Sequence, residues 1–332
     1  MIKVAILSFW HVHAHDYTKQ AMEHPGTQVV ALWDELPERG KKEATERELK
    51  WFDSLEQLLA DNEIDAVIVN SPTNMHREVI IAAANANKHI FTEKVVATTI
   101  NEVNEIIAAV NRNQVKLMVS LPRLNDGSTL AIQNFLRDDV LGEITLTRAR
   151  LSHNGALAGW LPAHFFNLEQ CGGGAMIDLG CHPMYLVRLF MGVPESVSAH
   201  YGYVSGKEVE DNAVAILKYP NGGLGIVEAG FVNEHSPFTL ELHGTKGSLM
   251  YGTPENKLMI RSSLVAEFSQ SWVEILELPS NRASAFEQWI LHIQSGTTAD
   301  DNIALASDLT RLMEAANLSV KLNRSVSLNE LE

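Results

Sequence analysis

The run Ile2-Lys3-Val4-Ala5-Ile6-Leu7 opens the chain as a short, strand-like segment. Further short apolar runs of the same kind follow at Val29–Trp33, Ala66–Val69, His89–Phe91 and Lys116–Val119. Stretches with helical spacing lie between them at Glu43–Leu49, Leu55–Ala60, His76–Ala86 and Ile100–Asn111. Because continuous apolar strands alternate with helices, the first part of the chain is predicted to form a parallel sheet with helices on both faces.

Polar residues follow several of these strands, at the edge where a parallel sheet binds its ligands. They are Asp34, the segment Ser71-Pro72-Thr73-Asn74, and the pair Glu93-Lys94. Asp34 lies about 20 residues past the first turn, where a dinucleotide fold places an acid on the ribose 2′-hydroxyl. An acid there repels a 2′-phosphate and favours NAD over NADP. The alternative is that Asp34 only ends its strand.

The first turn departs from the dinucleotide-binding pattern, which expects Gly-x-Gly-x-x-Gly. The chain instead reads Ser8-Phe9-Trp10-His11-Val12-His13, so all three glycine positions are filled by other residues. We expect Ser8 to make the tight turn, Phe9 and Trp10 to cover the cofactor, and the following helix N-terminus to offer N–H groups to pyrophosphate. The bulk of Trp10 and His13 predicts cofactor binding that is shifted, weakened or lost.

His11, His13 and His15 form a His-x-His-x-His string in this region. Alternate residues share one face of a strand, but this stretch should turn into a helix, where positions i and i+2 diverge. The acid near the string is Asp16. We therefore expect no metal and interpret the imidazoles as loop groups near the cofactor phosphates or the substrate.

In the second half, the run Gly172 to His182 puts three glycines before an apolar stretch that carries Asp178 and His182. Residues four apart lie on one helical face, so the acid and the imidazole should point the same way. A helix over Met176–Phe190 is expected to cover one face of a sheet, and a second over Asn302–Leu318 to return to the first domain. Strands are predicted at Thr145–Leu151, Val197–Val204, Ala213–Tyr219, Leu224–Phe231, Thr239–His243, Ser248–Tyr251, Leu258–Arg261 and Val273–Leu276. Tight turns between them indicate an antiparallel sheet.

The length of 332 residues suggests two domains. A net charge of −15 argues against broad nucleic-acid binding and against docking on anionic membranes. Cys171 and Cys181 are read as small buried thiols rather than a disulfide. The apolar run at the start is too short for a signal peptide or a spanning helix, so we expect a cytoplasmic protein.

Several motifs in order resemble the glucose–fructose oxidoreductase, inositol dehydrogenase and MocA family of NAD(P)-dependent oxidoreductases. They are Pro72-Thr73-Asn74 with His76, Glu93-Lys94, Gly172 to His182, Glu210-Asp211-Asn212, and Gly244-Thr245-Lys246-Gly247. The resemblance implies an α/β N-terminal domain with a Rossmann-like parallel sheet, over residues 1–122. It also implies an α+β C-terminal domain with a large, mostly antiparallel open-faced sheet, over 123–332, which forms a homodimer or homotetramer through that sheet.

The resemblance also implies roles for individual residues. Lys94 would polarise the substrate oxygen, His182 would be the general base, and Asp178 would bind substrate hydroxyls or orient His182. The implied cofactor-binding residues are Ser8, Phe9, Trp10, His11, Val12, Asp34, Ser71, Pro72, Asn74, His76, Glu93 and Lys94. Weaker substrate-binding candidates are Arg123, Trp160 and His164, with surface placement or core packing as their alternatives.

One departure from the family affects the lysine, because Val95 stands where the family has proline. The Lys94 backbone is therefore expected to be less restricted. The implied activity is an NAD(P)-dependent oxidoreductase, with NAD as the expected cofactor, acting on a secondary alcohol or ketone of a sugar, cyclitol or related polyol. The alternatives are a non-catalytic ligand sensor on the same scaffold and an NAD-assisted glycosidase.

Overall fold

The computed structural model describes residues 1–253 and 255–331, and the chain divides into two compact units. The first unit comprises Met1–Leu121 and Ala283–Ser307, and the second comprises Pro122–Arg282 and Asp308–Glu332. The long helix α11 (Asp300–Leu322) begins in the first unit and ends in the second. Within the described residues, no helix combines the length and the apolar character needed to cross a membrane.

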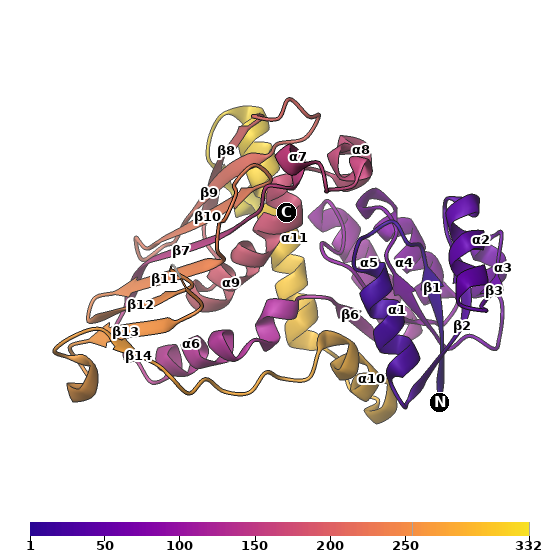
Figure 1. Cartoon of the computed structure of the whole chain (residues 1–332), viewed down its shortest axis with the longest axis horizontal. Coiled ribbons are helices and arrows are strands. Elements are labelled where there is room, and N and C mark those ends of the chain that lie inside the picture. Colours follow the sequence, from indigo (N-terminus) through magenta and orange to yellow (C-terminus); the bar gives the residue numbers. More distant parts are fainter. Residues whose placement is uncertain (254, 332) are drawn as a thin grey trace. The chain divides into compact units, whose positions relative to one another are not determined.

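The first unit is built on a parallel sheet (Figure 1). Its described strands are β1 (Ile2–Leu7), β2 (Thr27–Trp33), β3 (Lys50–Trp51), β4 (Ala66–Val69), β5 (His89–Thr92) and β6 (Leu117–Val119). Their order is β3-β2-β1-β4-β5-β6, so the direction of winding reverses between β1 and β4. A crevice at such a reversal is where doubly wound sheets bind nucleotides. The predicted Rossmann-like sheet is confirmed; the short edge strand β3 was not predicted.

The helices α1 to α5 lie between these strands in the sequence, and the predicted bounds differ mainly at α2; α10 comes much later in the chain and was not predicted. The helices are α1 (Ala14–Glu23), α2 (Pro37–Glu46), α3 (Leu55–Leu59), α4 (His76–Asn85), α5 (Ile100–Asn113) and α10 (Ala285–Ser295). The helix predicted over 43–49 actually begins at Pro37, where proline suits a first turn. Its sequence is almost entirely polar, so apolar periodicity could not mark its start.

The core of the first unit joins β1, α1 and α10 in one cluster. Val4 and Ile6 of β1 belong to this cluster, as do Tyr17 of α1 and Phe286 and Trp289 of α10. Rings of Tyr17, Phe91 and Trp289 make close contacts, with centroids 5.1 Å apart for Tyr17–Phe91 and 5.7 Å for Phe91–Trp289. This packing brings α10, from late in the sequence, onto the strands of the first 121 residues.

The second unit contains a large and mostly antiparallel sheet (Figure 1). Its described strands are β7 (Ile144–Ser152), β8 (Ser196–Gly202), β9 (Asn212–Lys218), β10 (Leu224–Gly230), β11 (Thr239–Gly244), β12 (Gly247–Tyr251), β13 (Leu258–Ser262), β14 (Val273–Glu274) and β15 (Val326–Ser327). They lie in the order β14-β13-β12-β11-β7-β10-β9-β8-β15. Strands β7 and β10 pair in parallel, and the other pairs are antiparallel. This confirms the prediction of an α+β C-terminal domain with a large, mostly antiparallel sheet.

The helices of the second unit correct one prediction. They are α6 (Gly127–Arg137), the short α7 (Gly155–Ala158) and α8 (Leu168–Cys171), α9 (Cys181–Met191), and the second part of α11. The single helix expected over 176–190 is instead a π-helical segment over Met176–Gly180 followed by α9. Strand alternation leaves the side chains of Ile216 and Leu224 about two-fifths exposed on this sheet.

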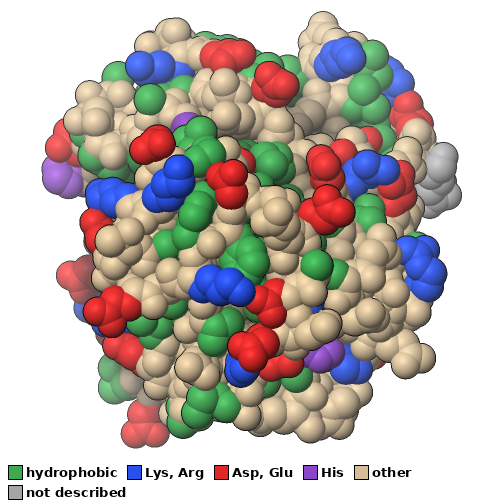
Figure 2. Space-filling model, turned by 90° about the vertical axis from the view of Figure 1, so that its right-hand side faces the viewer, with side chains coloured by type: hydrophobic (Ala, Val, Ile, Leu, Met, Phe, Trp, Pro, Cys, Tyr) green, Lys and Arg blue, Asp and Glu red, His purple; other side chains and the backbone are tan. Residues whose placement is uncertain are grey.

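Charged side chains of both signs occur on one face of the molecule. On the face in Figure 2, Asp and Glu side chains are intermixed with Lys and Arg. The acidic excess of the chain is therefore spread over this face rather than gathered in one block.

The aromatic core of the first unit yields a stability prediction. Trp289 of α10 is fully buried, whereas Leu291 of the same helix is 57% exposed. Trp289→Ala should lower the free energy of unfolding by about 3–5 kcal/mol, because it removes apolar contacts and leaves a cavity. The matched control Leu291→Ala should change it by less than about 1 kcal/mol. Urea unfolding followed by circular dichroism measures both, and equal losses would contradict the assignment of α10 to this core.

Candidate functional site

The first loop of the parallel sheet makes its tight turn at Ser8. Ser8 has φ of 77°, a left-handed conformation that glycine adopts most easily. Its Oγ accepts a hydrogen bond from the Trp10 N–H at 3.0 Å, which helps to hold the turn. A serine thus takes the conformation that the dinucleotide pattern normally gives to glycine.

The backbone N–H groups of this loop already have acceptors within the protein. Phe9 N–H donates to Asp34 Oδ2 at 2.8 Å, His11 N–H to the Asn70 carbonyl at 3.1 Å, and His13 N–H to His11 Nδ1 at 3.2 Å. The Phe9 and Trp10 side chains are buried, at 6% and 5% exposed, while Val12 is 44% exposed. Phosphate binding at these particular N–H groups would therefore have to replace existing bonds.

Asp34 is fully hydrogen-bonded in this structure. Its Oδ1 accepts from Leu36 N–H and Arg39 Nη2, and its Oδ2 accepts from Phe9 N–H and Arg39 Nε, all at 2.8 Å. Arg39 also reaches Glu35 Oε1 at 2.5 Å. Burial raises the pKa of Glu35, and the nearby Asp34 charge adds to that increase. Two carboxylates therefore share one guanidinium where the adenosine ribose is expected.

The end of β4 carries buried polar atoms without a protein partner. Both polar atoms of the Asn70 side chain and the Ser71 Oγ are in this state. His76 is also buried and links two segments, with Nδ1 2.8 Å from the Val95 carbonyl and Nε2 3.1 Å from the Ser71 carbonyl. Burial lowers the pKa of His76. Unsatisfied polar atoms beside the nucleotide-binding crevice fit a polar cofactor there.

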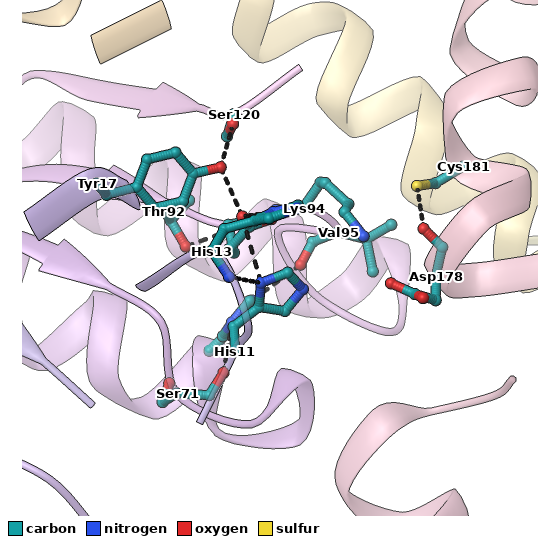
Figure 3. A network of polar contacts seen from close by, with 12 residues as sticks. His11, His13, Tyr17, Ser71, Thr92, Lys94, Val95, Ser120, Asp178 and Cys181 are labelled. Atoms are coloured by element: carbon teal, nitrogen blue, oxygen red, sulfur yellow. Dashed lines mark hydrogen bonds and ion pairs between the residues drawn. The ribbon is translucent and has the colours of Figure 1, made fainter. Parts of the chain in front are cut away.

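Glu93 gathers polar groups from three segments of the first unit, among them His11, His13 and Tyr17, which Figure 3 shows close together. Its Oε1 accepts from Tyr17 OH at 2.6 Å, lies 2.7 Å from His13 Nδ1, and lies 3.5 Å from His11 Nδ1. Tyr17 OH also lies 2.7 Å from Ser120 Oγ. Burial would raise the pKa of Glu93, but the charges of His11 and His13 and the hydrogen bond from His13 hold it well below its usual range. The carboxylate is therefore ionised at neutral pH.

Lys94 follows directly and is held by the same carboxylate. Its backbone N–H donates to Glu93 Oε2 at 2.9 Å, and the residue is 5% exposed. The peptide bond between Lys94 and Val95 is cis. The structure thus brings three predicted site residues of the first unit together, His11, Glu93 and Lys94, and adds His13 to them.

In the second unit, Glu210 supports the glycine run. Its Oε2 accepts from Gly174 N–H at 2.8 Å, and its Oε1 accepts from Met176 N–H at 2.9 Å. Burial raises the pKa of Glu210, and the bonds from these N–H groups oppose that rise. A side chain at Gly174 would place its Cβ 2.1 Å from the Glu210 carbonyl oxygen, so glycine is needed for this close approach.

Asp178 and His182 lie on either side of the junction between the π-helical segment and α9. The Cys181 thiol donates to the Asp178 carbonyl at 3.1 Å (Figure 3), and the Cys171 thiol donates to the His164 carbonyl at 3.2 Å. Both cysteines are buried thiols, as predicted. Because the π-helical segment ends between Asp178 and His182, these two residues are not separated by one turn of a regular α-helix.

His182 Nδ1 lies 3.1 Å from the Tyr185 hydroxyl. That hydroxyl also accepts the Arg123 backbone N–H at 3.0 Å. Burial raises the pKa of Tyr185 well above its usual value, so the phenol keeps its proton. Tyr185 thereby fixes the imidazole orientation. The Arg123 guanidinium itself lies over the Phe238 ring at 3.8 Å.

An aromatic group stands at the end of β7. His153 stacks on Phe231 with ring centroids 5.1 Å apart and contacts Trp160 at 4.5 Å. Burial lowers the pKa of His153, and the Asp178 charge opposes this. Trp160 is 56% exposed and donates to Asn154 Oδ1 at 3.2 Å, while the His164 ring lies beside Phe165.

Sequence reasoning missed Tyr185, Arg39 and His153 as partners of the predicted residues. Tyr185 had a usable signal, since it lies three residues after His182 on the same helical face. Arg39 is five residues after Asp34 in a helix that the sequence did not delimit. The link between His13 and Glu93 spans 80 residues and had no local signal.

Comparison with known families agrees with this geometry. Residues 5–121 match the oxidoreductase family with an NAD-binding Rossmann fold, and residues 129–250 match the GFO/IDH/MocA C-terminal domain. The chain belongs to this family of NAD-binding oxidoreductases, which confirms the predicted resemblance.

Individual relatives are sugar and cyclitol enzymes by name. The 1,5-anhydro-D-fructose reductase of Ensifer adhaerens is 28% identical over 318 residues, covering 91% of this chain and 93% of that protein. The scyllo-inositol 2-dehydrogenase (NAD⁺) of Bacillus subtilis is 27% identical over 262 residues, covering 76% and 74%. The structure of a levoglucosan dehydrogenase in complex with NADH and levoglucosan has a TM-score of 0.82 at 19% identity, covering 98% of this chain and 99% of that one. That structural likeness supports the fold.

The ionised Glu93 yields a pH prediction. Because its pKa is lowered in the folded state, its contribution to stability is fully present above the unfolded value of about 4.3 and is lost as the pH falls below it. Glu93→Gln should therefore lower the free energy of unfolding at pH 7, and its deficit against the unsubstituted chain should shrink below about pH 4. Urea unfolding at pH 7, 5 and 3.5 measures this. Glu56→Gln, at an exposed position of α3, should change little, and a deficit for Glu93→Gln that is constant with pH would contradict the assignment.

The glycine run yields a packing prediction. Gly174→Ala should destabilise the second unit by about 1–3 kcal/mol, because the new methyl group meets backbone that cannot easily move. Gly202→Ala is the matched control, since its Cβ would lie 3.4 Å from its nearest neighbour. Thermal unfolding compares the two variants, and an equal effect would show that Gly174 is not held closely against Glu210.

Proposed function

We propose that this chain is an NAD-dependent dehydrogenase that oxidises or reduces a secondary alcohol or ketone of a sugar, cyclitol or related polyol. The observation that carries the proposal is Lys94, a buried lysine fixed by an ionised carboxylate at the end of β5 in an NAD-binding fold. The names of the sugar and cyclitol relatives support the substrate class.

The cofactor-binding residues proposed here lie in the first unit. Asn70 and Ser71 have buried polar atoms that a dinucleotide would satisfy, and Ser8 supplies the turn. Pro72 and Asn74 follow on the same edge, and His76 holds Ser71 in position. Asp34 and Glu35 together outweigh the single positive charge of Arg39, which supports NAD over NADP. NAD, when bound, accepts or supplies a hydride at the carbon that bears the reacting oxygen.

The protein's own groups handle the oxygen and its proton. We assign the Lys94 ammonium to the substrate oxygen, where a positive charge stabilises a developing alkoxide. The imidazole of His182 takes the hydroxyl proton during oxidation and returns it during reduction. Tyr185 is a positioning residue, because it acts through the His182 ring. Asp178 binds a neighbouring substrate hydroxyl, and Trp160, whose ring is tilted against His153, offers an apolar face to the sugar ring.

Assembly and location are also proposals. The partly exposed Ile216 and Leu224 on the large sheet support a homodimer or homotetramer formed through that surface. The thiol state of Cys171 and Cys181 supports the cytoplasm, where thiols stay reduced.

One observation favours a second function, a ligand sensor without catalysis. The N–H groups of Phe9, Trp10, His11 and His13 are bonded within the protein rather than left for pyrophosphate. In a sensor, the second unit would still bind its polyol while the first bound no nucleotide.

Nucleotide binding and turnover test the proposed dehydrogenase activity. NAD should raise the melting temperature more than NADP does, and a panel of cyclitols, anhydro sugars and aldoses should give a lasting change at the reduced-nicotinamide absorbance. Lys94→Ala and His182→Asn should each lower kcat by about 10²–10⁴-fold while binding of a substrate analogue is retained. The control Lys42→Ala, an exposed lysine of α2, should leave turnover unchanged.

The alternatives give different results. No response to either nucleotide, with polyol binding retained, would reject the dehydrogenase and support the sensor. Product formation with only a transient absorbance change would indicate cofactor-assisted glycosidase chemistry. Full turnover by Lys94→Ala would reject its assigned role.

A further inference from the structure

We propose that His11, His13 and Glu93 form a site for one divalent transition-metal ion, such as Zn²⁺ or Co²⁺. Their candidate ligand atoms, one from each side chain, all lie within 4.8 Å of one another. Two come from the loop after β1 and the third from the end of β5, all within the first unit. The sequence alone showed two imidazoles of this set; the structure adds the carboxylate.

The distances suit a small ion. Four-coordinate zinc with bonds of about 2.0–2.2 Å holds neighbouring ligand atoms roughly 3.3–3.5 Å apart. His11 Nδ1 and Glu93 Oε1 already lie 3.5 Å apart. His13 Nδ1 and Glu93 Oε1 are 2.7 Å apart, a hydrogen-bond distance, so the ion would replace the proton there and move the two atoms apart by less than about 1 Å. The His13 side chain is 40% exposed and has room for this movement.

A metal requires His11 and His13 as neutral imidazoles and Glu93 as a carboxylate. In the neutral form of the ring, His11 Nδ1 accepts the His13 backbone N–H at 3.2 Å, and this is the form in which the nitrogen can bind a metal. Glu93 is ionised and is held from both sides, by Tyr17 OH at 2.6 Å and by the Lys94 N–H at 2.9 Å. Outer hydrogen bonds of this kind fix the direction of a ligating carboxylate.

The donor set selects the class of ion. Two imidazoles and one carboxylate suit zinc, cobalt, nickel or copper, whereas magnesium and calcium prefer oxygen ligands. Three protein ligands also leave a fourth position for water or a small molecule. The site does not rest on the proposed dehydrogenase activity, because the metal alone serves as the probe.

The test is a Co²⁺ titration of the full chain, free of any histidine tag, followed by calorimetry and by visible absorption of the bound ion. One ion per chain is expected. His13→Ala should weaken binding by more than the roughly 10–100-fold typical of losing an outer partner. His15→Ala is the matched control, since His15 belongs to the same string but its Nδ1 lies 3.0 Å from Arg47 Nη2. It should bind Co²⁺ like the unsubstituted chain.

A second variant, Glu93→Gln, keeps the size of the side chain and removes its charge, and should also lose tight binding. Thermal unfolding checks that each variant is folded; if Glu93→Gln is not, the half-exposed His13 variant decides alone. The proposal is overturned by any of three results: no stoichiometric binding to the unsubstituted chain, equal binding by His13→Ala, or an equal loss in His15→Ala. None of these results depends on whether NAD binds.

Discussion

The buried carboxylate of Glu93 is the constraint on which the first unit's polar site depends. A charged group this deep is tolerated only where donors surround it. Tyr17 of α1, the His13 imidazole of the first loop and the backbone of Lys94 supply those donors. One charge therefore fixes the first loop, the start of α1 and the residue after β5 in a single arrangement. The same carboxylate also fixes the backbone of Lys94, because it accepts the Lys94 N–H.

A second buried carboxylate has a comparable task in the other unit. Glu210 accepts two backbone N–H groups where the glycine run meets the π-helical segment. Those N–H groups would otherwise be unpaired at the start of a helix. The close approach needs a residue without a side chain at Gly174, which explains why glycine precedes the segment that carries Asp178. Each unit thus organises its own polar residues around one buried acid.

Much of the fold could be predicted from the sequence because buried parallel strands are continuous apolar runs. The strands Ile2–Leu7 and Ala66–Val69 were predicted with the observed bounds. Helix α2 was misplaced because it buries only Gly40, Glu43 and Ala44, so its sequence lacks an apolar stripe. The π-helical segment was missed because periodicity alone does not reveal one extra residue in a turn.

The candidate site was predictable residue by residue but not in its connections. Ser8, Glu93 and Lys94 follow strands, and strand ends can be read from sequence. The bonds from Arg39 to Asp34 are local but depend on a helix whose start was not predicted, whereas the contact of His13 with Glu93 is tertiary. Side chains 80 residues apart meet only because the sheet places β1 and β5 on either side of β4. Topology, rather than local pattern, thus decides which polar residues become partners.

The π-helical segment over Met176–Gly180 also sets a register. Such a segment behaves as an α-helix with one residue inserted, and each residue of an α-helix turns the chain by about 100°. Loss of a single residue here would restore a regular helix and swing Asp178 by about that angle relative to α9, with no change in the residues themselves. The number of residues in this turn therefore sets the direction of Asp178 relative to α9, whatever the chemistry of the side chain. A one-residue insertion or deletion would thus change the direction of this acid relative to α9 while every neighbouring residue stayed the same.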